Sequence, residues 1–275
     1  MGTSGWLYPP WRGVFYPRGL AHKRELEYIS RRVNSVEING SFYSLQRPSS
    51  YQSWVEQTPA DFLFAVKGGR FITHMKRLRD VEAPLANFFA SGVLALRHKL
   101  GPILWQLPGN FALDMSVLES FFEQLPRTTT AAASLARKHD SRLDGRAWTT
   151  PGRRGPLRHA IEVRNPSFAA PEFIALARKH NIALVVADTA GKFPYFEEVT
   201  ADFVYIRLHG DTELYASGYT PSALDRWAEK VRAWHNQGDV YVYFDNDMKV
   251  KAPGDAMALS ARLSHSTEVP GHTSR

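Results

Sequence analysis

Residues 35–43 read Ser-Val-Glu-Ile-Asn-Gly-Ser-Phe-Tyr, an alternation of polar and apolar residues that runs into a glycine. A period of two is typical of a β-strand, so Glu37 and Asn39 share one face, and Val36 and Ile38 the other. Burial of a carboxylate and an amide is unfavourable unless both have polar partners. The stretch therefore predicts a strand whose C-terminal end borders a polar pocket.

Three later stretches, residues 160–166, 186–189 and 204–210, have the same design of an apolar strand that becomes polar at its C-terminal end. They contribute Glu162 with Arg164, then Asp188, then Arg207 with His209. Parallel strands of one sheet end on the same side, so we expect these polar ends to converge on one site.

Eight strand–helix alternations are predicted along the chain. The predicted strands cover 2–7, the stretch within 35–43, 62–67, 102–107, 160–164, 183–187, 203–208 and 240–244. The predicted helices cover 20–32, 51–57, 83–100, the segment from Asp114 to 124, 171–180, 221–235 and 254–263, with an extra helix over 131–143. Such alternation favours parallel βαβ units, and a closed (β/α)₈ barrel accounts for both the strand count and the length of 275 residues.

An open, doubly wound sheet is the alternative fold, but no G-x-G-x-x-G loop follows the first strand. We therefore predict an α/β fold with a single TIM-type (β/α)₈ barrel over residues 1–265 and a flexible tail over 266–275. Segment 127–159 interrupts the alternation and is interpreted as an insertion.

The composition narrows the functional classes. Cysteine is absent, which excludes disulfides, thiolate nucleophiles and cysteine-based metal centres and fits a reducing cytoplasm. No signal-like or membrane-spanning segment is present, so a cytoplasmic protein without a membrane partner is expected. The net charge is +7, and residues 137–159 hold seven Arg and Lys against two Asp, a local charge of +5. Such a basic run suits either a polyanion-binding surface or, more commonly, a solvated loop.

The polar residues at the predicted strand ends form the candidate site. They are Glu37, Asn39, Lys67, Gln106, Glu162, Arg164, Asp188, Arg207, His209, Asp245 and Asn246, with His74 from the loop after the third strand and Trp6, Tyr8, Phe42 and Tyr43 as possible walls. The carboxylates and cations among them could instead form a self-neutralising ion network with no catalytic task. Clusters of titratable groups in a pocket usually mark function, and buried ion pairs seldom improve stability.

The mixture of charges bears on the chemistry. Glu37, Glu162, Asp188 and His209 could bind a divalent metal, but cations lie among them in the sequence, so no metal site is assigned. Arg and Lys donors match phosphate or carboxylate oxygens, and carboxylates can transfer protons. Lys67 could also form a Schiff base if its pKa were depressed by a neighbouring cation. No H-E-x-x-H, Walker or G-x-S-x-G motif is present.

Over nearly its whole length the chain resembles the YecE-like family, also called domain of unknown function 72. The matching motifs are residues 2–6, 15–17, 36–39 with 42–43, Trp54 with 58–59, 64–67 with 72–74, 106–108, 162–164 with 166–168, 188–189, 207–210 and 243–246. The resemblance implies a TIM-type barrel and no established activity. The chain differs where the family usually has two consecutive Asn, because Asp245 occupies the first position.

The leading hypothesis is an enzyme that acts on a small anionic substrate, either phosphorylated or carboxylated. In it Glu37, Glu162, Asp188 and His209 are the catalytic candidates. The substrate-binding candidates are Asn39, Lys67, His74, Gln106, Arg164, Arg207 and Asn246. The alternatives are a metal-dependent phosphodiesterase or nuclease and a non-enzymatic ligand-binding barrel. We expect no cofactor and weak or no nucleic-acid binding, and the oligomeric state stays open.

Overall fold

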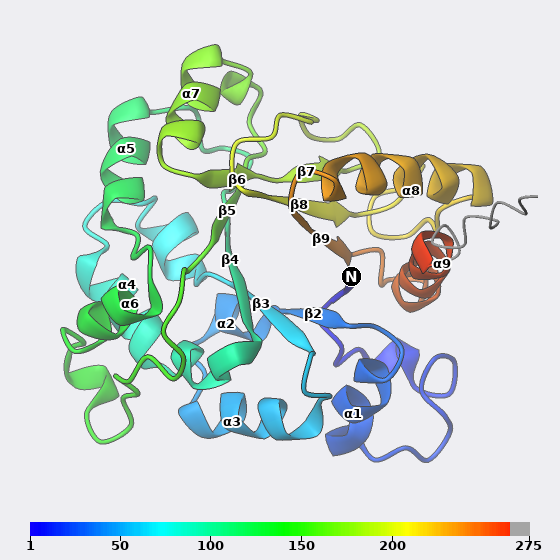
Figure 1. Ribbon diagram of the computed structural model, residues 1–275, viewed down its shortest axis with the longest axis horizontal. Helices are drawn as coiled ribbons and strands as arrows, with labels where there is room; N and C mark the ends of the chain where they lie inside the picture. The colour runs from blue at the N-terminus through cyan, green and yellow to red at the C-terminus, as the bar shows by residue number, and fades with distance from the viewer. Residues whose placement is uncertain (265–275) are drawn as a thin grey trace, which may run out of the picture.

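The computed structural model describes residues 1–264 of the chain and contains one parallel sheet of nine strands (Figure 1). The order in the sheet is β6-β5-β4-β3-β2-β1-β9-β8-β7. The strands are β1 (Gly2–Ser4), β2 (Ser35–Ile38), β3 (Leu63–Lys67), β4 (Leu100–Gln106), β5 (His159–Glu162), β6 (Ile182–Leu184), β7 (Val186–Asp188), β8 (Phe203–Leu208) and β9 (Asp239–Phe244).

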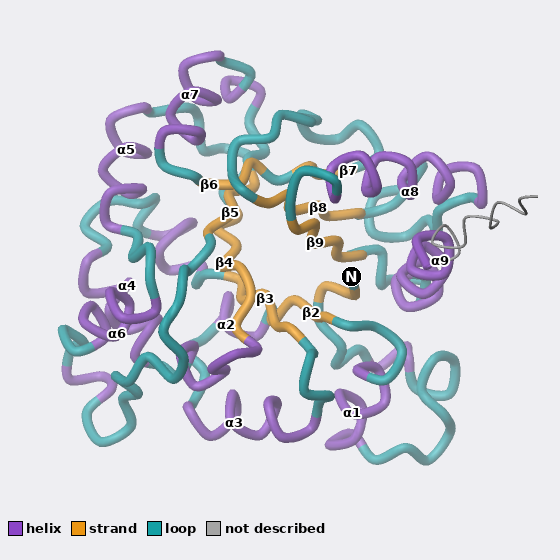
Figure 2. The backbone as a smooth tube through the Cα atoms, in the orientation of Figure 1, coloured by secondary structure: helices purple, strands orange, loops and turns teal. Residues whose placement is uncertain are grey.

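The sheet curls into a nearly closed barrel (Figure 2). Strands β6 and β7 are two halves of one extended segment on either side of Val185. The first half pairs with β5 and the second with β8, so this segment lies between both edges of the sheet. Eight strand positions thus surround the axis, and the predicted TIM-type α/β barrel is confirmed.

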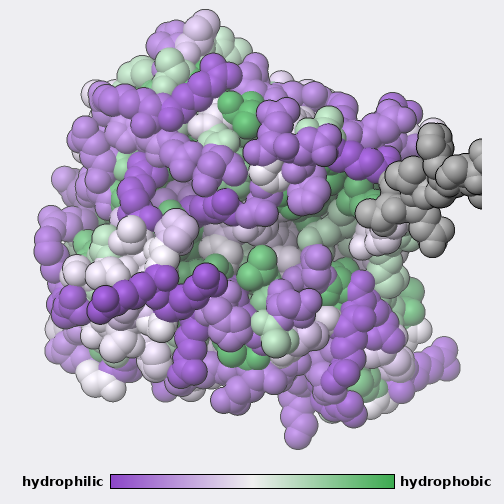
Figure 3. Space-filling view, in the orientation of Figure 1, coloured by the Kyte–Doolittle hydropathy of each residue, from purple (hydrophilic) through white to green (hydrophobic). Residues whose placement is uncertain are grey.

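Helices cover the outside of the barrel (Figure 1). They are α1 (Glu25–Ser30), α2 (Gly40–Tyr43), α3 (Pro48–Gln57), α4 (Glu82–Ala90), α5 (Met115–Gln124), α6 (Thr129–Ala136), α7 (Pro171–Lys179), α8 (Pro221–His235) and α9 (Ala252–Ser264). Their apolar faces pack on the strands, and hydrophilic residues cover most of the face seen in Figure 3. No helix within residues 1–264 is long and apolar enough to span a membrane.

The barrel interior changes from apolar to charged along the strands. Its lower part is filled by small residues, including Ala65 and Ala160, and by the large rings of Tyr205 and Tyr243, all buried. Arg207 lies two residues after Tyr205 in β8 and therefore on the same face of the strand. The apolar layer therefore supports a charged layer at the C-terminal ends of the strands, where barrel enzymes bind substrates.

The structure corrects the predicted helix over 83–100. Helix α4 ends at Ala90, and a separate 3₁₀ segment covers Val93–Lys99. Between them Gly92 has φ +117°, and a Cβ there would lie 2.6 Å from Pro48 Cα. The apolar period continues through the break, which is why the sequence pattern suggested one helix. The predicted loop 70–80 likewise contains a π-helical turn, Phe71–Met75.

The extra helix predicted over 131–143 also divides, into α6 and the 3₁₀ turn Ser141–Leu143. This insertion packs along the side of the barrel: Asn87 of α4 donates to Asp140 at 2.9 Å, and the backbone N–H of Trp148 donates to Ala90. Its basic charge is partly paired, because Arg158 contacts Asp239 at 2.5 Å. The tail predicted over 266–275 lies outside the described residues.

Candidate active site

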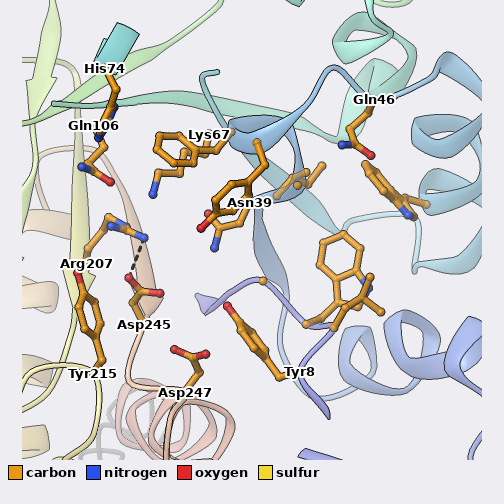
Figure 4. Close-up of a pocket in the computed structure, with 18 of the residues that line it drawn as sticks. Tyr8, Asn39, Gln46, Lys67, His74, Gln106, Arg207, Tyr215, Asp245 and Asp247 are labelled. Atoms are coloured by element: carbon orange, nitrogen blue, oxygen red, sulfur yellow. Dashed lines mark hydrogen bonds and ion pairs between the residues drawn. The ribbon is translucent and has the colours of Figure 1, made fainter. Parts of the chain in front are cut away.

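A cavity of about 620 Å³ opens at the C-terminal mouth of the barrel (Figure 4). The predicted wall residues Trp6, Tyr8, Phe42 and Tyr43 all line it. So do six of the predicted substrate-binding residues, namely Asn39, Lys67, His74, Gln106, Arg164 and Arg207. A pocket of this size, with one aromatic wall and several convergent polar groups, suits a small molecule.

Arg207 lies at the base of this cavity with its side chain only 1% exposed. Its Nε donates to Glu37 Oε2 at 3.1 Å and its Nη2 to Glu37 Oε1 at 2.9 Å. Its Nη1 donates to Glu162 Oε2 at 2.7 Å, and Nη2 also donates to Ser4 and to Asp245 Oδ2, at 3.0 Å for the latter. The guanidinium therefore joins the ends of β2, β5 and β8.

The pKa values of this cluster reflect the charge pairing. Burial alone would raise the pKa of Glu162, but Arg164 and Arg207 outweigh it and hold the value well below the ordinary one. Burial would lower the pKa of Arg207, but Glu37, Asp245 and Glu162 raise it. Glu162 is thus ionised and the guanidinium of Arg207 is charged, and few donors of Arg207 face a ligand.

His209 and Asp245 form a second contact in this layer. His209 Nδ1 lies 2.9 Å from Asp245 Oδ2, but the approach lacks the direction of a hydrogen bond. Its Nε2 lies 4.0 Å from Glu162 Oε1. His209 is fully buried and does not line the cavity, so it can reach a ligand only through Asp245.

Lys67 is the last residue of β3 and points into the cavity (Figure 4). Within residues 1–264 no carboxylate oxygen lies within ion-pair distance of its Nζ, which sits 4.4 Å from the centre of the Phe42 ring. Burial, together with the charge of Arg207, lowers the pKa of Lys67 to about 8 against the opposing effect of the nearby carboxylates. This side chain is therefore available to a ligand.

Two further residues border the same side of the cavity. Arg164 donates from Nε to Glu162 Oε1 at 2.7 Å and lies over the ring of Phe193. Burial and the charges of Lys67, Arg70, Arg164 and Arg77 lower the pKa of His74 to about 4. His74 is thus neutral at physiological pH, mainly because it is buried, and the surrounding cations add to this effect.

The sequence analysis missed Asp247 as a site residue. It lines the cavity two residues after Asp245, on the side opposite Lys67 and His74 (Figure 4). Burial, with a contribution from the charge of Asp245, raises its pKa to about 6. Tyr215 was also missed. The i, i+2 spacing from Asp245 could have indicated Asp247, whereas no local pattern marks Tyr215.

Five predicted site residues lie outside this cavity, His209 among them. Glu37 and Glu162 lie beneath it, fully buried against Arg207. Asp188 accepts a hydrogen bond from the Tyr219 hydroxyl at 3.0 Å and lines a different cavity beside Asp211 and Lys230. Asn246 donates to Asp255 at 2.8 Å. The structure therefore brings together the ends of β1 to β5, β8 and β9 and separates Asp188 and Asn246 from them.

Among the described residues, the polar side chains of the site do not form a metal-binding set. Within residues 1–264 no group of three or more His, Asp or Glu side chains is arranged to hold one. The carboxylates of Glu37, Glu162 and Asp245 converge on the guanidinium of Arg207, which takes the central position that a cation would need. The three carboxylates are thus arranged around the Arg207 side chain and not around a divalent metal ion.

The fold and the mouth cavity define a TIM-type barrel of the kind that carries enzyme sites. The family model described as protein of unknown function DUF72 matches residues 1–274, and the chain belongs to this family. The UPF0759 protein YecE of Escherichia coli strain K12 is 26% identical over 92% of this chain and 88% of its own length.

Solved structures agree with this assignment. A DUF72 family protein from Thermotoga maritima has a TM-score of 0.76 and 26% identity, over 96% of this chain and 98% of its own. One from Enterococcus faecalis has a TM-score of 0.73 and 17% identity, over 99% and 98%. D-psicose 3-epimerase from Clostridium cellulolyticum, solved with D-tagatose, has a TM-score of 0.54 at 10% identity over 98% and 99% of the two chains and shares the fold.

Proposed function

We propose that the protein is an enzyme that acts on a small anionic substrate, phosphorylated or carboxylated, at the barrel mouth. Lys67 and Arg164 bind the anionic group, and Asp247 transfers protons. The carboxylates of Glu37, Glu162 and Asp245 hold the Arg207 guanidinium in a fixed position at the floor of the cavity, beneath the ligand. His209 acts on the site through Asp245, and Asn39, Gln106 and His74 offer neutral polar contacts.

The observation that carries this proposal is the separation of charge across the cavity. Lys67, Arg164 and the cations around His74 make one side positive. Asp247, whose pKa is near 6, lies on the other side. The anionic group of a substrate is attracted to the positive side, so the rest of the substrate faces Asp247. The Asp247 carboxyl group can both donate and accept a proton near neutral pH.

Calorimetric titration with matched ligands tests the proposal. We expect glycerol 3-phosphate or lactate to bind and glycerol, which has no charge, to bind far more weakly. Lys67→Met should weaken the binding of the anion by roughly 10- to 100-fold, the value of a charge-assisted contact. Lys23→Met, a change at an exposed lysine, is the control. Equal binding of charged and uncharged ligands would count against an anion site.

A metal-dependent phosphodiesterase or nuclease is less well supported, because Arg207 occupies the centre of the carboxylate cluster. The basic insertion lies along the side of the barrel, so we propose at most weak, salt-sensitive nucleic-acid binding. A gel-shift titration at two salt concentrations, with magnesium, manganese or zinc added to test for cleavage, checks both points. A non-enzymatic ligand-binding barrel would bind the anion without turnover.

A further inference from the structure

Two buried lysines of this chain differ in how their amino groups are bound. Lys99 Nζ donates to Val55 O at 2.7 Å, Thr58 O at 2.8 Å and Thr58 Oγ1 at 3.0 Å, which satisfies its three protons. Lys67, with 9% exposure, has no oxygen acceptor for Nζ within residues 1–264 and faces the mouth cavity. In the described part of the chain the Lys67 amino group therefore has no fixed partner and is presented to the cavity, whereas the amino group of Lys99 is fully engaged.

The backbone around Lys67 is held firmly. The Ser41 hydroxyl donates to the Lys67 carbonyl at 2.6 Å, and the N–H of Gly68 donates to Leu104 O at 2.8 Å. A Cβ at Gly68 would lie 2.2 Å from the Trp105 ring, so only glycine fits there. The base of the Lys67 side chain is thus fixed, and its amino group projects from a rigid strand end into the cavity.

The surroundings favour the neutral amine. The ring centre of Phe42 lies 4.4 Å from the amino group, and the Lys67 side chain is only 9% exposed. Arg207 opposes the ammonium charge, whereas Glu37, Glu162 and Asp245 are already paired with Arg207. With a pKa of about 8, the Lys67 amine is unprotonated in roughly a tenth of the molecules at pH 7. For an ordinary lysine, with a pKa of 10.5, this fraction is roughly 300-fold smaller.

We propose that Lys67 is a nucleophile that forms an imine with a carbonyl group of the substrate, so that the ligand class is a small aldehyde or ketone that also carries a phosphate or carboxylate. The proposal rests on the proposed function: the protonated form of Lys67 attracts the anionic group together with Arg164, and Arg164 holds that group while the neutral amine reacts. It adds a covalent step and a substrate class to that site.

Imine formation releases one water molecule. The Nζ lone pair of the neutral amine attacks the carbonyl carbon, the C=O π pair moves to oxygen, and the nitrogen transfers one proton to that oxygen. The resulting carbinolamine loses its oxygen as water together with the second amine proton, which leaves a C=N bond. The first proton passes from nitrogen to oxygen within the adduct and the second leaves with the water, so the step is balanced by Lys67 and the substrate alone.

Reductive trapping on the intact protein tests the imine. The protein is incubated at pH 7 with dihydroxyacetone phosphate or pyruvate and with sodium cyanoborohydride, which reduces the imine to a stable amine. Peptide mass spectrometry should show a mass increase equal to the probe minus one oxygen atom at Lys67. We expect roughly 300-fold more modification there than at exposed lysines, in line with the unprotonated fractions at pH 7, and none at Lys99. Lys67→Arg, which keeps the charge, should abolish the adduct.

The matched alcohols glycerol 3-phosphate and lactate separate this proposal from the proposed function. They carry the same anions but cannot form an imine. If the alcohols bind and the carbonyl probes leave no adduct on Lys67, the imine is overturned and the anion site stands. If neither alcohols nor carbonyl probes bind, both proposals fail. Adducts spread equally over Lys67, Lys99 and surface lysines would also overturn the imine, because they would show chemical reactivity without a site.

Discussion

Arg207 and Glu37 form a two-point contact across the barrel, with Nε to Oε2 at 3.1 Å and Nη2 to Oε1 at 2.9 Å. Two parallel bonds fix both the distance and the plane of the two groups. Because Arg207 also contacts Glu162 and Asp245, one guanidinium balances carboxylates from three directions. The strand ends that surround the cavity are held in place by this single side chain.

Arg207→Met is therefore expected to destabilise the protein by about 3–5 kcal/mol, because it leaves the Glu37 and Glu162 carboxylates buried without a counter-charge. Urea unfolding at pH 7 measures the loss. Arg31→Met removes an exposed contact to Glu27 and should cost no more than about 0.5 kcal/mol.

The pH dependence distinguishes stranded carboxylates from lost packing. In the wild type the lowered pKa of Glu162 gives stability that is present above its unfolded pKa and is lost as the pH falls through the lower folded value. In Arg207→Met the carboxylates can protonate in the folded state, so the deficit should shrink below about pH 4.5. A deficit that is the same at pH 4 and pH 7 would contradict the charge explanation.

The sequence pattern predicted where most residues of this site lie, but it did not predict which of them form ion pairs with one another. The period of two along each strand placed Glu37, Lys67, Glu162 and Arg207 at one end of the barrel, and the structure has them there. Which carboxylates meet Arg207 depends on the register between strands that are far apart in sequence, and no single strand carries that information. For this reason the sequence suggested Arg207 as a ligand contact equivalent to Lys67, although its donors are engaged within the protein.

Gly92 accounts for the helix that the sequence pattern extended too far. Gly92→Ala should destabilise the protein by about 2–4 kcal/mol, because φ is +117° and the added Cβ would meet Pro48 at 2.6 Å. Gly145→Ala is the matched control: φ is +72°, but nothing lies within 4 Å of the added Cβ, so only about 1 kcal/mol of backbone strain is expected. Thermal unfolding compares the two, and equal losses would show that the contact with Pro48 is unimportant.

Asp247 should titrate near pH 6 in the folded protein, since burial raises its pKa from 3.8. Carboxyl carbon chemical shifts of aspartate-labelled protein measure this value, with Asp247→Asn to assign the signal. Between pH 4 and 6 the unfolded state releases this proton first, so the wild type loses stability as the pH rises. Asp247→Asn lacks this loss and should gain about 1–2 kcal/mol relative to the wild type across the interval. An Asp247 signal that titrates near pH 4 would remove it as the proton-transfer group.

Lys67→Met should leave the fold intact and change the pH dependence of stability. Methionine has a similar length and no charge to bury, so at pH 7 the variant is expected to be at least as stable as the wild type. The folded pKa of Lys67, about 8, is below the unfolded value of 10.5. As the pH rises from 8 to 10.5 the folded state loses this proton before the unfolded state does, and the wild type gains up to about 3 kcal/mol of stability relative to the variant.

Urea unfolding at pH 7, 8, 9 and 10 measures this difference in stability, and Lys23→Met should show no such pH-dependent difference. A constant difference between wild type and Lys67→Met would mean that the Lys67 amine is solvated as an ordinary lysine, which removes the basis for its reactivity.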